Sequence, residues 1–148
     1  MYKNVMVAID DSETSRSALK EAQHIARTSN AHLHIVHVAD ETLLNLHGHA
    51  LSSVANLEQA ASSLIKAGQA LVDAAVAESQ GLAVSGLVVE ARNRRVSETI
   101  CDKAKELGVD LIVIGRHGQR GLATLLLGSV AEQLAKISDA SVLLVRKH

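Results

Sequence analysis

Short runs of aliphatic residues alternate with longer segments of helical period along this 148-residue chain. Each run ends at turn-forming residues, which is typical of strands that are buried on both faces. The predicted strands span residues 5–9, 31–38, 84–91, 111–114 and 142–145. Because a helix-like segment separates each strand from the next, the pattern predicts an α/β fold, an open five-stranded parallel sheet with helices on both faces.

The segments between the runs carry apolar residues at helical spacing. One predicted helix is capped by Ser12 and ends near Thr28, and a long one runs from Leu57 to about Gln80. Two shorter helices are expected over residues 96–107 and 130–137. Residues 42–55 show little period and are expected to form a loop with a short helical piece. No linker or internal repeat is visible, so residues 1–148 are interpreted as a single domain.

Composition narrows the class of function. Hydrophobic residues make up 47% of the chain but aromatic residues only 1%, so the core must be aliphatic. With 15 basic and 16 acidic residues and almost no aromatic rings for stacking, nucleic acid is not an expected partner. No run approaches the ~20 apolar residues of a membrane span, and no leader peptide is recognisable, so a cytoplasmic protein without membrane association is predicted. Cys101 is the only cysteine, which excludes an intrachain disulfide.

A glycine-rich segment, residues 115–130, follows the fourth predicted strand and leads into a helix. Backbone amides collect around anions at such a place. Without a Cβ atom, Gly115, Gly118 and Gly128 can adopt positive φ or let the main chain approach a ligand closely. Ser129 lies where a helix N-cap is expected, and its hydroxyl could bind an amide or a phosphate oxygen. The pattern favours phosphate binding over a glycine-rich turn without a ligand.

Basic residues strengthen this interpretation. Arg116, His117 and Arg120 could add charge-assisted hydrogen bonds to a phosphate. The segment contains neither a Gly-Lys-Ser/Thr loop nor a GxGxxG fingerprint after the first strand, so it is neither a Walker A nor a classical dinucleotide motif.

The spacing of Gly115, Gly118, Gly128 and Ser129 resembles that of the ATP-binding branch of the universal stress protein family. The resemblance extends over nearly the whole chain: residues 7–13 are similar to the family's first strand and turn, residues 110–115 to its fourth strand, and residues 125–130 to its closing signature. It implies a Rossmann-like sheet with strand order 3-2-1-4-5. The first and fourth strands then lie side by side at the switch point of the sheet, where ligands bind.

The resemblance also implies a set of site residues. Ala8, Ile9 and Asp10 would contact the nucleoside, and the main chain of Val38 would hydrogen-bond the adenine edge. Asp10 has an alternative role as a residue that stabilises its own turn. The predicted nucleotide-binding set is completed by Gly115, Arg116, Gly118, Gln119, Gly128, Ser129 and Val130, of which the glycines, Ser129 and Val130 would hold the ribose and phosphates.

Two positions depart from the family pattern. Asp11 stands where glycine is usual, and its charge should weaken ATP binding unless Mg²⁺ intervenes or the side chain points away. Ser141 stands where proline is often found before the last strand, which should affect only the entry to that strand.

The leading hypothesis is an ATP-binding regulatory protein of the stress response. The alternatives are a slow ATPase and a nucleotide-free dimeric interaction protein, and at most weak hydrolysis is expected. A homodimer is predicted through the last strand, from Val142 to Val145. The histidines are not expected to bind a metal, because His32 and His34 share a strand face while His37 points to the other.

Overall fold

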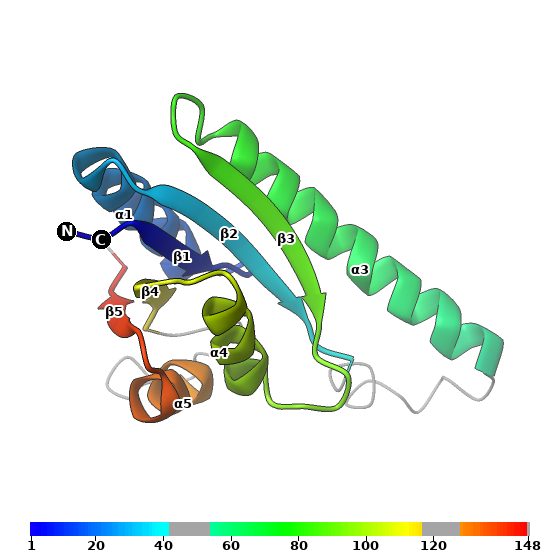
Figure 1. Ribbon diagram of the computed structural model, residues 1–148. Helices are drawn as coiled ribbons and strands as arrows, with labels where there is room; N and C mark the ends of the chain where they lie inside the picture. Colours follow the sequence, from blue (N-terminus) through cyan, green and yellow to red (C-terminus); the bar gives the residue numbers. More distant parts are fainter. Residues whose placement is uncertain (42–53, 117–127, 148) are drawn as a thin grey trace.

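The computed structural model of the protein describes residues 1–41, 54–116 and 128–147. Its strands pair in parallel in the order β3-β2-β1-β4-β5 (Figure 1). This order and the open parallel sheet confirm the predicted fold class. The strands are β1 (Asn4–Ala8), β2 (His32–Ala39), β3 (Val84–Glu90), β4 (Leu111–Gly115) and β5 (Ser141–Val145).

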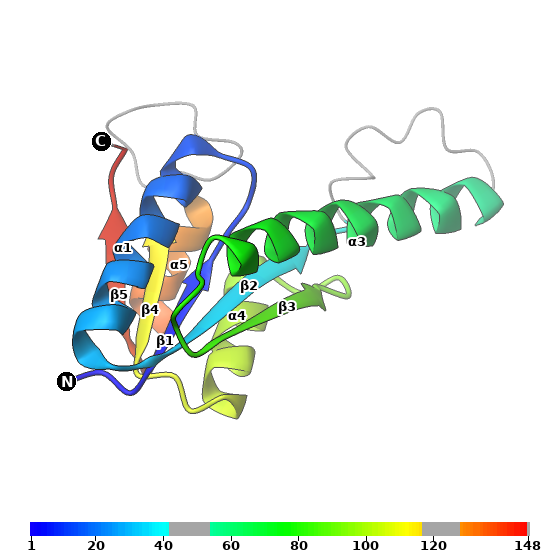
Figure 2. The same ribbon diagram turned by 90° about the horizontal axis from the view of Figure 1, so that it is seen from above.

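Helices cover both faces of the sheet (Figure 2). Helices α1 (Glu13–Ser29) and α3 (Val54–Ala77) pack on one face, and α4 (Val96–Glu106) and α5 (Ser129–Ile137) pack on the other. Strand β1 leads into α1 and strand β4 leads into α5. The two central strands therefore send their connections to opposite faces of the sheet.

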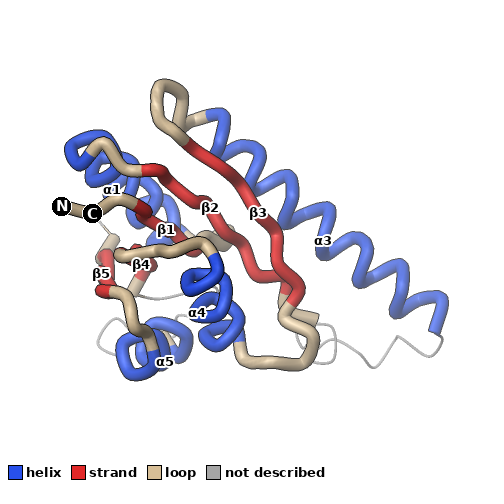
Figure 3. Tube along the Cα trace, viewed as in Figure 1, coloured by secondary structure: helices blue, strands red, loops and turns tan. Residues whose placement is uncertain are grey.

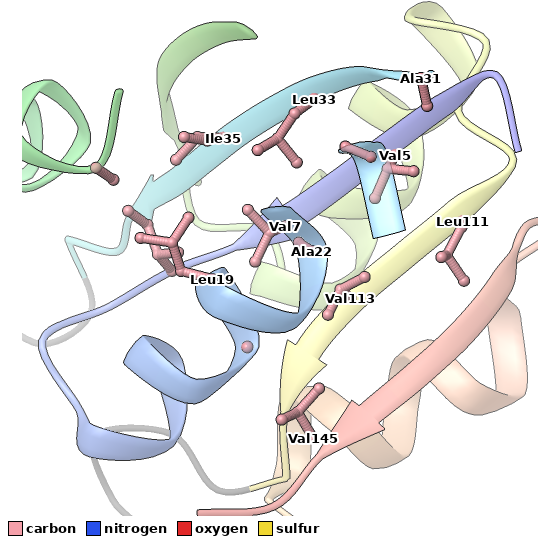
Figure 4. Close-up of a cluster of buried hydrophobic side chains, with 14 of the residues drawn as sticks. Val5, Val7, Leu19, Ala22, Ala31, Leu33, Ile35, Leu111, Val113 and Val145 are labelled. Carbon is pink, nitrogen blue, oxygen red and sulfur yellow. The ribbon is translucent and has the colours of Figure 1, made fainter. Parts of the chain in front are cut away.

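Alternate strand residues form two aliphatic cores. Val5 and Val7 of β1 join Leu33 of β2 beneath α1 and α3 (Figure 4), whereas Met6 of β1 joins Ile112 of β4 beneath α4 and α5. All five side chains are completely buried. Burial on both faces explains why these strands are continuous apolar runs rather than alternating ones.

Helix α3 lies close along β2 and β3 (Figure 3). A Cβ atom on Gly86 of β3 would lie 2.5 Å from Val72 Cγ1 and 2.7 Å from Val76 Cγ2. The glycine that interrupts the third aliphatic run is thus needed for the close approach of this helix to the sheet.

Predicted and observed element ends differ by a few residues. Helix α3 ends at Ala77 rather than near Gln80, and Gly81 adopts φ +86° in the turn that follows. Gly108 adopts φ +65° just beyond α4, as expected of a residue that ends a helix. The loop predicted from residue 42 onward falls outside the described residues up to position 53. Within the described ranges, no helix combines the length and apolar composition that crossing a membrane requires.

Candidate functional site

The carboxyl ends of β1 and β4 meet at the centre of the sheet. Ala8 pairs with Ile114, so the turn that begins at Asp10 and the connection that begins at Arg116 leave the same edge side by side. Their helices then pass to opposite faces. In open α/β sheets this arrangement creates a crevice that holds ligands, and the two segments singled out from the sequence both border it.

The turn from β1 to α1 is held by its own side chains. Asp10 Oδ1 accepts a hydrogen bond from the Ser12 amide at 2.8 Å, and the Asp10 amide donates to Ser15 Oγ at 2.8 Å. Ser12 caps α1 as predicted, with its Oγ accepting from the Ser15 amide at 3.2 Å. Asp10 therefore does stabilise its own turn, and the start of α1 is closed by local side chains.

The connection from β4 to α5 is organised by main-chain bonds. The Arg116 amide donates to the Val145 carbonyl at 2.8 Å, and the Arg116 carbonyl accepts from the Gly128 amide at 2.8 Å. The second bond joins the two ends of the intervening segment. It sets the first turn of α5, with Ser129 and Val130, directly beside the end of β4.

One expectation about this connection was wrong, because Ser129 is not the N-cap of α5. The N-cap of α5 is Gly128, with φ −61° and ψ 150° and no side-chain cap, and Ser129 is already the first helical residue. The cap position needs extended backbone, which glycine adopts readily, so the helix begins one residue earlier than a serine cap implies. Gly115 and Gly128 also do not adopt positive φ. Gly115 is needed for another reason.

Gly115 allows α1 to touch β4. A Cβ atom at this position would lie 2.8 Å from Thr14 Oγ1 and 3.0 Å from the Thr14 carbonyl carbon. No side chain larger than hydrogen fits without moving the first turn of α1. Thr14 is 9% exposed, and its contact with the last residue of β4 holds the two borders of the crevice together.

The end of β2 extends beyond β1. The ladder between these strands ends with the bond from the Ile9 amide to the Val36 carbonyl at 2.8 Å, whereas β2 stays paired with β3 up to Ala39. The Ala39 carbonyl accepts from Ala91 on the β3 side. Because successive residues of a strand direct their main-chain groups to opposite sides, the amide and carbonyl of Val38 face the β1 side, past its end.

Acidic groups surround the start of α1. Asp11 is exposed, and Glu13 forms an ion pair with Lys147 near the C-terminus. The hydrogen bond from Lys147 holds the pKa of the Glu13 carboxyl below its ordinary value of 4.5. These carboxylates complement the dipole of α1 and make its N-terminus unfavourable for an anion.

Those sequence-predicted residues that the structure describes therefore gather at one edge of the sheet. Main-chain connections and strand pairing bring together Ala8, Ile9, Asp10, Val38, Gly115, Arg116, Gly128, Ser129 and Val130. Gly118 and Gln119 lie outside the described residues. Sequence reasoning missed Thr14 and Ser15, although hydroxyl residues in the first turn after Ser12 are a recognisable capping signal.

The amino edge of the sheet carries the other polar features. The rings of His32 and His34 lie 4.3 Å apart between centroids, and both contact Ser85 Oγ, at 2.9 and 3.1 Å. Burial and the neighbouring His32 lower the pKa of His34. The predicted face shared by these two histidines is confirmed, and His37 points to the other face. The described residues contain no group of three or more side chains suited to a metal.

A pocket of about 270 Å³ also opens near the amino ends of β4 and β5. Its lining includes Cys101, Lys105 and Asp139, and burial raises the pKa of the Cys101 thiol. A raised thiol pKa favours the unreactive form. This pocket lies at the opposite edge of the sheet from the crevice between β1 and β4.

An open parallel sheet whose neighbouring strands β1 and β4 send their connections to opposite faces defines a doubly wound α/β protein. A model of the universal stress protein family matches residues 1–146, and this chain belongs to that family. It is 32% identical to universal stress protein YxiE of Bacillus subtilis, over 99% of this chain and 100% of the relative.

Two solved structures extend the comparison. The MJ0577 protein of Methanocaldococcus jannaschii superposes with a TM-score of 0.84 at 27% identity, covering 100% of this chain and 98% of that one. A universal stress protein in complex with cAMP superposes with a TM-score of 0.63 at 25% identity, covering 99% and 98%.

Proposed function

We propose that this protein binds an adenine nucleotide, ATP with Mg²⁺, in the crevice between β1 and β4. The observation that carries the proposal is the start of α5, where Gly128 provides no side-chain cap and the bond from Gly128 to Arg116 holds the first turn beside β4. Amides at such a helix start bind phosphate well. The cAMP complex of a similar protein supports adenine as the base.

Different residues would contact the base, the nucleoside and the phosphates of the nucleotide. The Val38 main chain would bind the adenine edge, and Ala8, Ile9 and Asp10 would border the nucleoside. The phosphates and ribose would lie against the end of β4 and the start of α5, within reach of Gly115, Arg116, Gly118, Gln119, Gly128, Ser129 and Val130.

Binding would serve regulation rather than turnover. Bound nucleotide can alter recognition by a protein partner only if it binds one conformation or assembly more tightly than another. Hydrolysis would be weak at most, because the sequence offers no clear base beyond Asp10 and Asp11 to orient an attacking water. A phosphate-release rate unchanged by Asp10→Ala would show that any turnover is incidental. The cytoplasmic location expected from the sequence stays a prediction.

Titration calorimetry with ATP, ADP, AMP and cAMP, with and without Mg²⁺, tests the proposal. Micromolar affinity, about −8 kcal/mol, is expected for at least one of them. Ser129→Ala should weaken binding several-fold, whereas Ser138→Ala at the other end of α5 is the matched control and should not. If no adenine nucleotide binds at millimolar concentration, the proposal is wrong.

We also propose a homodimer formed through β5, which stands at one edge of the sheet. Ser141 and Val145 direct main-chain groups toward β4, so the amides of Val142 and Leu144 face the open side. Such an edge invites pairing with a second copy. Val142→Pro removes one outward amide and should yield a monomer in sedimentation equilibrium, whereas Val142→Ala keeps the amide and should remain dimeric. Equal behaviour of the two variants would place the dimer contact elsewhere.

A further inference from the structure

We propose that His37 and Gly68 act as a positioning pair that keeps the main chain of Val38 available for adenine. His37 lies in β2 and Gly68 in α3, and neither is among the proposed ligand contacts. The inference rests on the proposed function, because it assigns a cause to the hydrogen-bonding edge of Val38 that lies past the end of the β1 ladder.

His37 binds the acceptor at which the β1–β2 ladder would otherwise continue. After the bond from Ile9 to the Val36 carbonyl, a regular parallel ladder continues with a bond from the Val38 amide to the Ile9 carbonyl. In this protein His37 Nδ1 contacts the Ile9 carbonyl oxygen at 2.7 Å. A carbonyl oxygen can only accept, so Nδ1 carries the hydrogen and donates. Among the described residues no main-chain bond joins the Val38 amide to this carbonyl, and the imidazole is bonded to it instead.

Gly68 makes room for this imidazole. A Cβ atom on Gly68 would lie 2.6 Å from His37 Cδ2 and 3.3 Å from His37 Nε2. Gly68 is buried within a 24-residue helix, where glycine is less favourable than alanine. The ring of His37, held under the helix by its bond to Ile9, provides a specific reason for glycine at this position.

The consequence is a donor and an acceptor side by side. With the Ile9 carbonyl bound to His37, the Val38 amide and carbonyl both point past the end of β1, and neither has a hydrogen-bond partner within the described residues. Adenine offers an acceptor at N1 beside a donor at N6, which matches this pair. Guanine reverses both groups and would meet the same edge with donor against donor and acceptor against acceptor. His37 and Gly68 therefore act through Val38 on recognition of the base and not of the phosphates.

The first experiment distinguishes recognition of the base from recognition of the phosphates. Gly68→Ala should displace the ring and weaken ATP binding by on the order of tenfold, the effect of about one hydrogen bond. Binding of inorganic triphosphate should not change. Ser62→Ala on an exposed part of α3 is the control and should affect neither ligand. If Gly68→Ala leaves ATP affinity unchanged, or weakens ATP and triphosphate equally, the inference is wrong.

A double-mutant cycle tests whether the two residues act together. His37→Ala alone should weaken ATP about as much as Gly68→Ala, and combining the two should add little, because the added methyl then meets no ring. His37→Asn places an amide near the position of Nδ1 and should restore part of the affinity. Additive losses, or no rescue by asparagine, would argue against the pair.

Hydrogen exchange at the Val38 amide, measured by NMR without ligand, tests the inference even if no adenine nucleotide binds. His37→Ala should free the Ile9 carbonyl and let the ladder extend, so the Val38 amide should exchange more slowly than in the parent protein. If His37→Ala merely loosened the fold, the Val38 amide would exchange faster than in the parent protein. Faster or unchanged exchange at Val38 would overturn the role of His37. If no adenine nucleotide binds but exchange of the Val38 amide slows in His37→Ala, only the proposed function is wrong.

Discussion

Helices α1 and α5 begin at the same edge of the sheet, but their first turns are completed in opposite ways. Ser12, Asp10 and Ser15 bond to main-chain or side-chain groups at the start of α1, and Glu13 adds a negative charge there. The start of α5 has a glycine cap without a side-chain bond. The start of α1 is thus capped by its own side chains, whereas the start of α5 has no side-chain cap within the part of the chain that the structure describes.

This difference suggests how the two borders divide their work. The α1 border is built for rigidity, since its polar groups are satisfied locally and Thr14 packs against Gly115. In the function proposed above, the α5 border would serve recognition, since a helix start without a side-chain cap favours an anion. Mutations of the capping and packing residues on the α1 side should therefore change mainly stability, and mutations at the start of α5 should change mainly affinity.

The largest expected effect comes from breaking the contact between the borders. Gly115→Ala should lower the free energy of unfolding in urea by about 1–3 kcal/mol, because the new methyl overlaps Thr14. Combining it with Thr14→Ala should recover part of the loss, since the 2.8 Å overlap with Oγ1 disappears while the backbone contact remains. A fully stable Gly115→Ala variant would show that α1 moves freely against β4.

The two serines at the helix starts provide a direct comparison. Ser12→Ala should cost about 1 kcal/mol of unfolding free energy, the usual value of an N-cap. Ser129→Ala should cost less than about 0.5 kcal/mol, because Ser129 makes no cap bond. In calorimetry, Ser129→Ala should weaken ATP binding more than Ser12→Ala does. If both serines affect stability equally, the contrast between the helix starts is wrong.

Asp11 tests the electrostatic part of the contrast. Asp11→Asn should tighten ATP binding without Mg²⁺ by roughly two- to fivefold, because an exposed carboxylate repels the nucleotide only weakly. The gain should shrink as salt is added. Asp139→Asn, at the amino edge and paired with Lys105, is the matched control and should not alter affinity. Equal gains from both variants would indicate an effect of net charge alone.

The smallest effect concerns Glu13. Its carboxyl has a folded-state pKa lowered below 4.5 by Lys147, so the charged form favours folding. This contribution is present above pH 4.5 and is lost as pH falls through the lowered folded-state pKa. Unfolding curves of the parent protein and of Glu13→Gln should therefore differ slightly near neutral pH and converge in acid. A difference that grows as pH falls would contradict the sign of the shift.

Much of the fold could be predicted from the sequence because its strands are buried on both faces. Runs such as residues 5–9 and 111–114 have no alternating polar positions, so the sequence predicts strands that are buried on both faces of a parallel sheet. The strand order followed from the family resemblance and is confirmed. The spacing of residues alone does not encode it, because order depends on contacts between distant segments.

The site was predicted less completely for physical reasons. Whether Gly128 or Ser129 caps α5 depends on where the extended backbone ends, and both residue types are acceptable at that position. The contact of Gly115 with Thr14 and that of Gly68 with His37 join residues far apart in sequence. The sequence shows each glycine, but it does not show the neighbouring side chain that leaves no room for a Cβ atom at that position.

The bond between Arg116 and Gly128 has one further consequence. It links the end of β4 directly to the start of α5, so these two elements do not depend on the chain between them for their relative position. Substitutions between the two anchors should therefore disturb the sheet and α5 less than substitutions at Arg116 or Gly128 themselves.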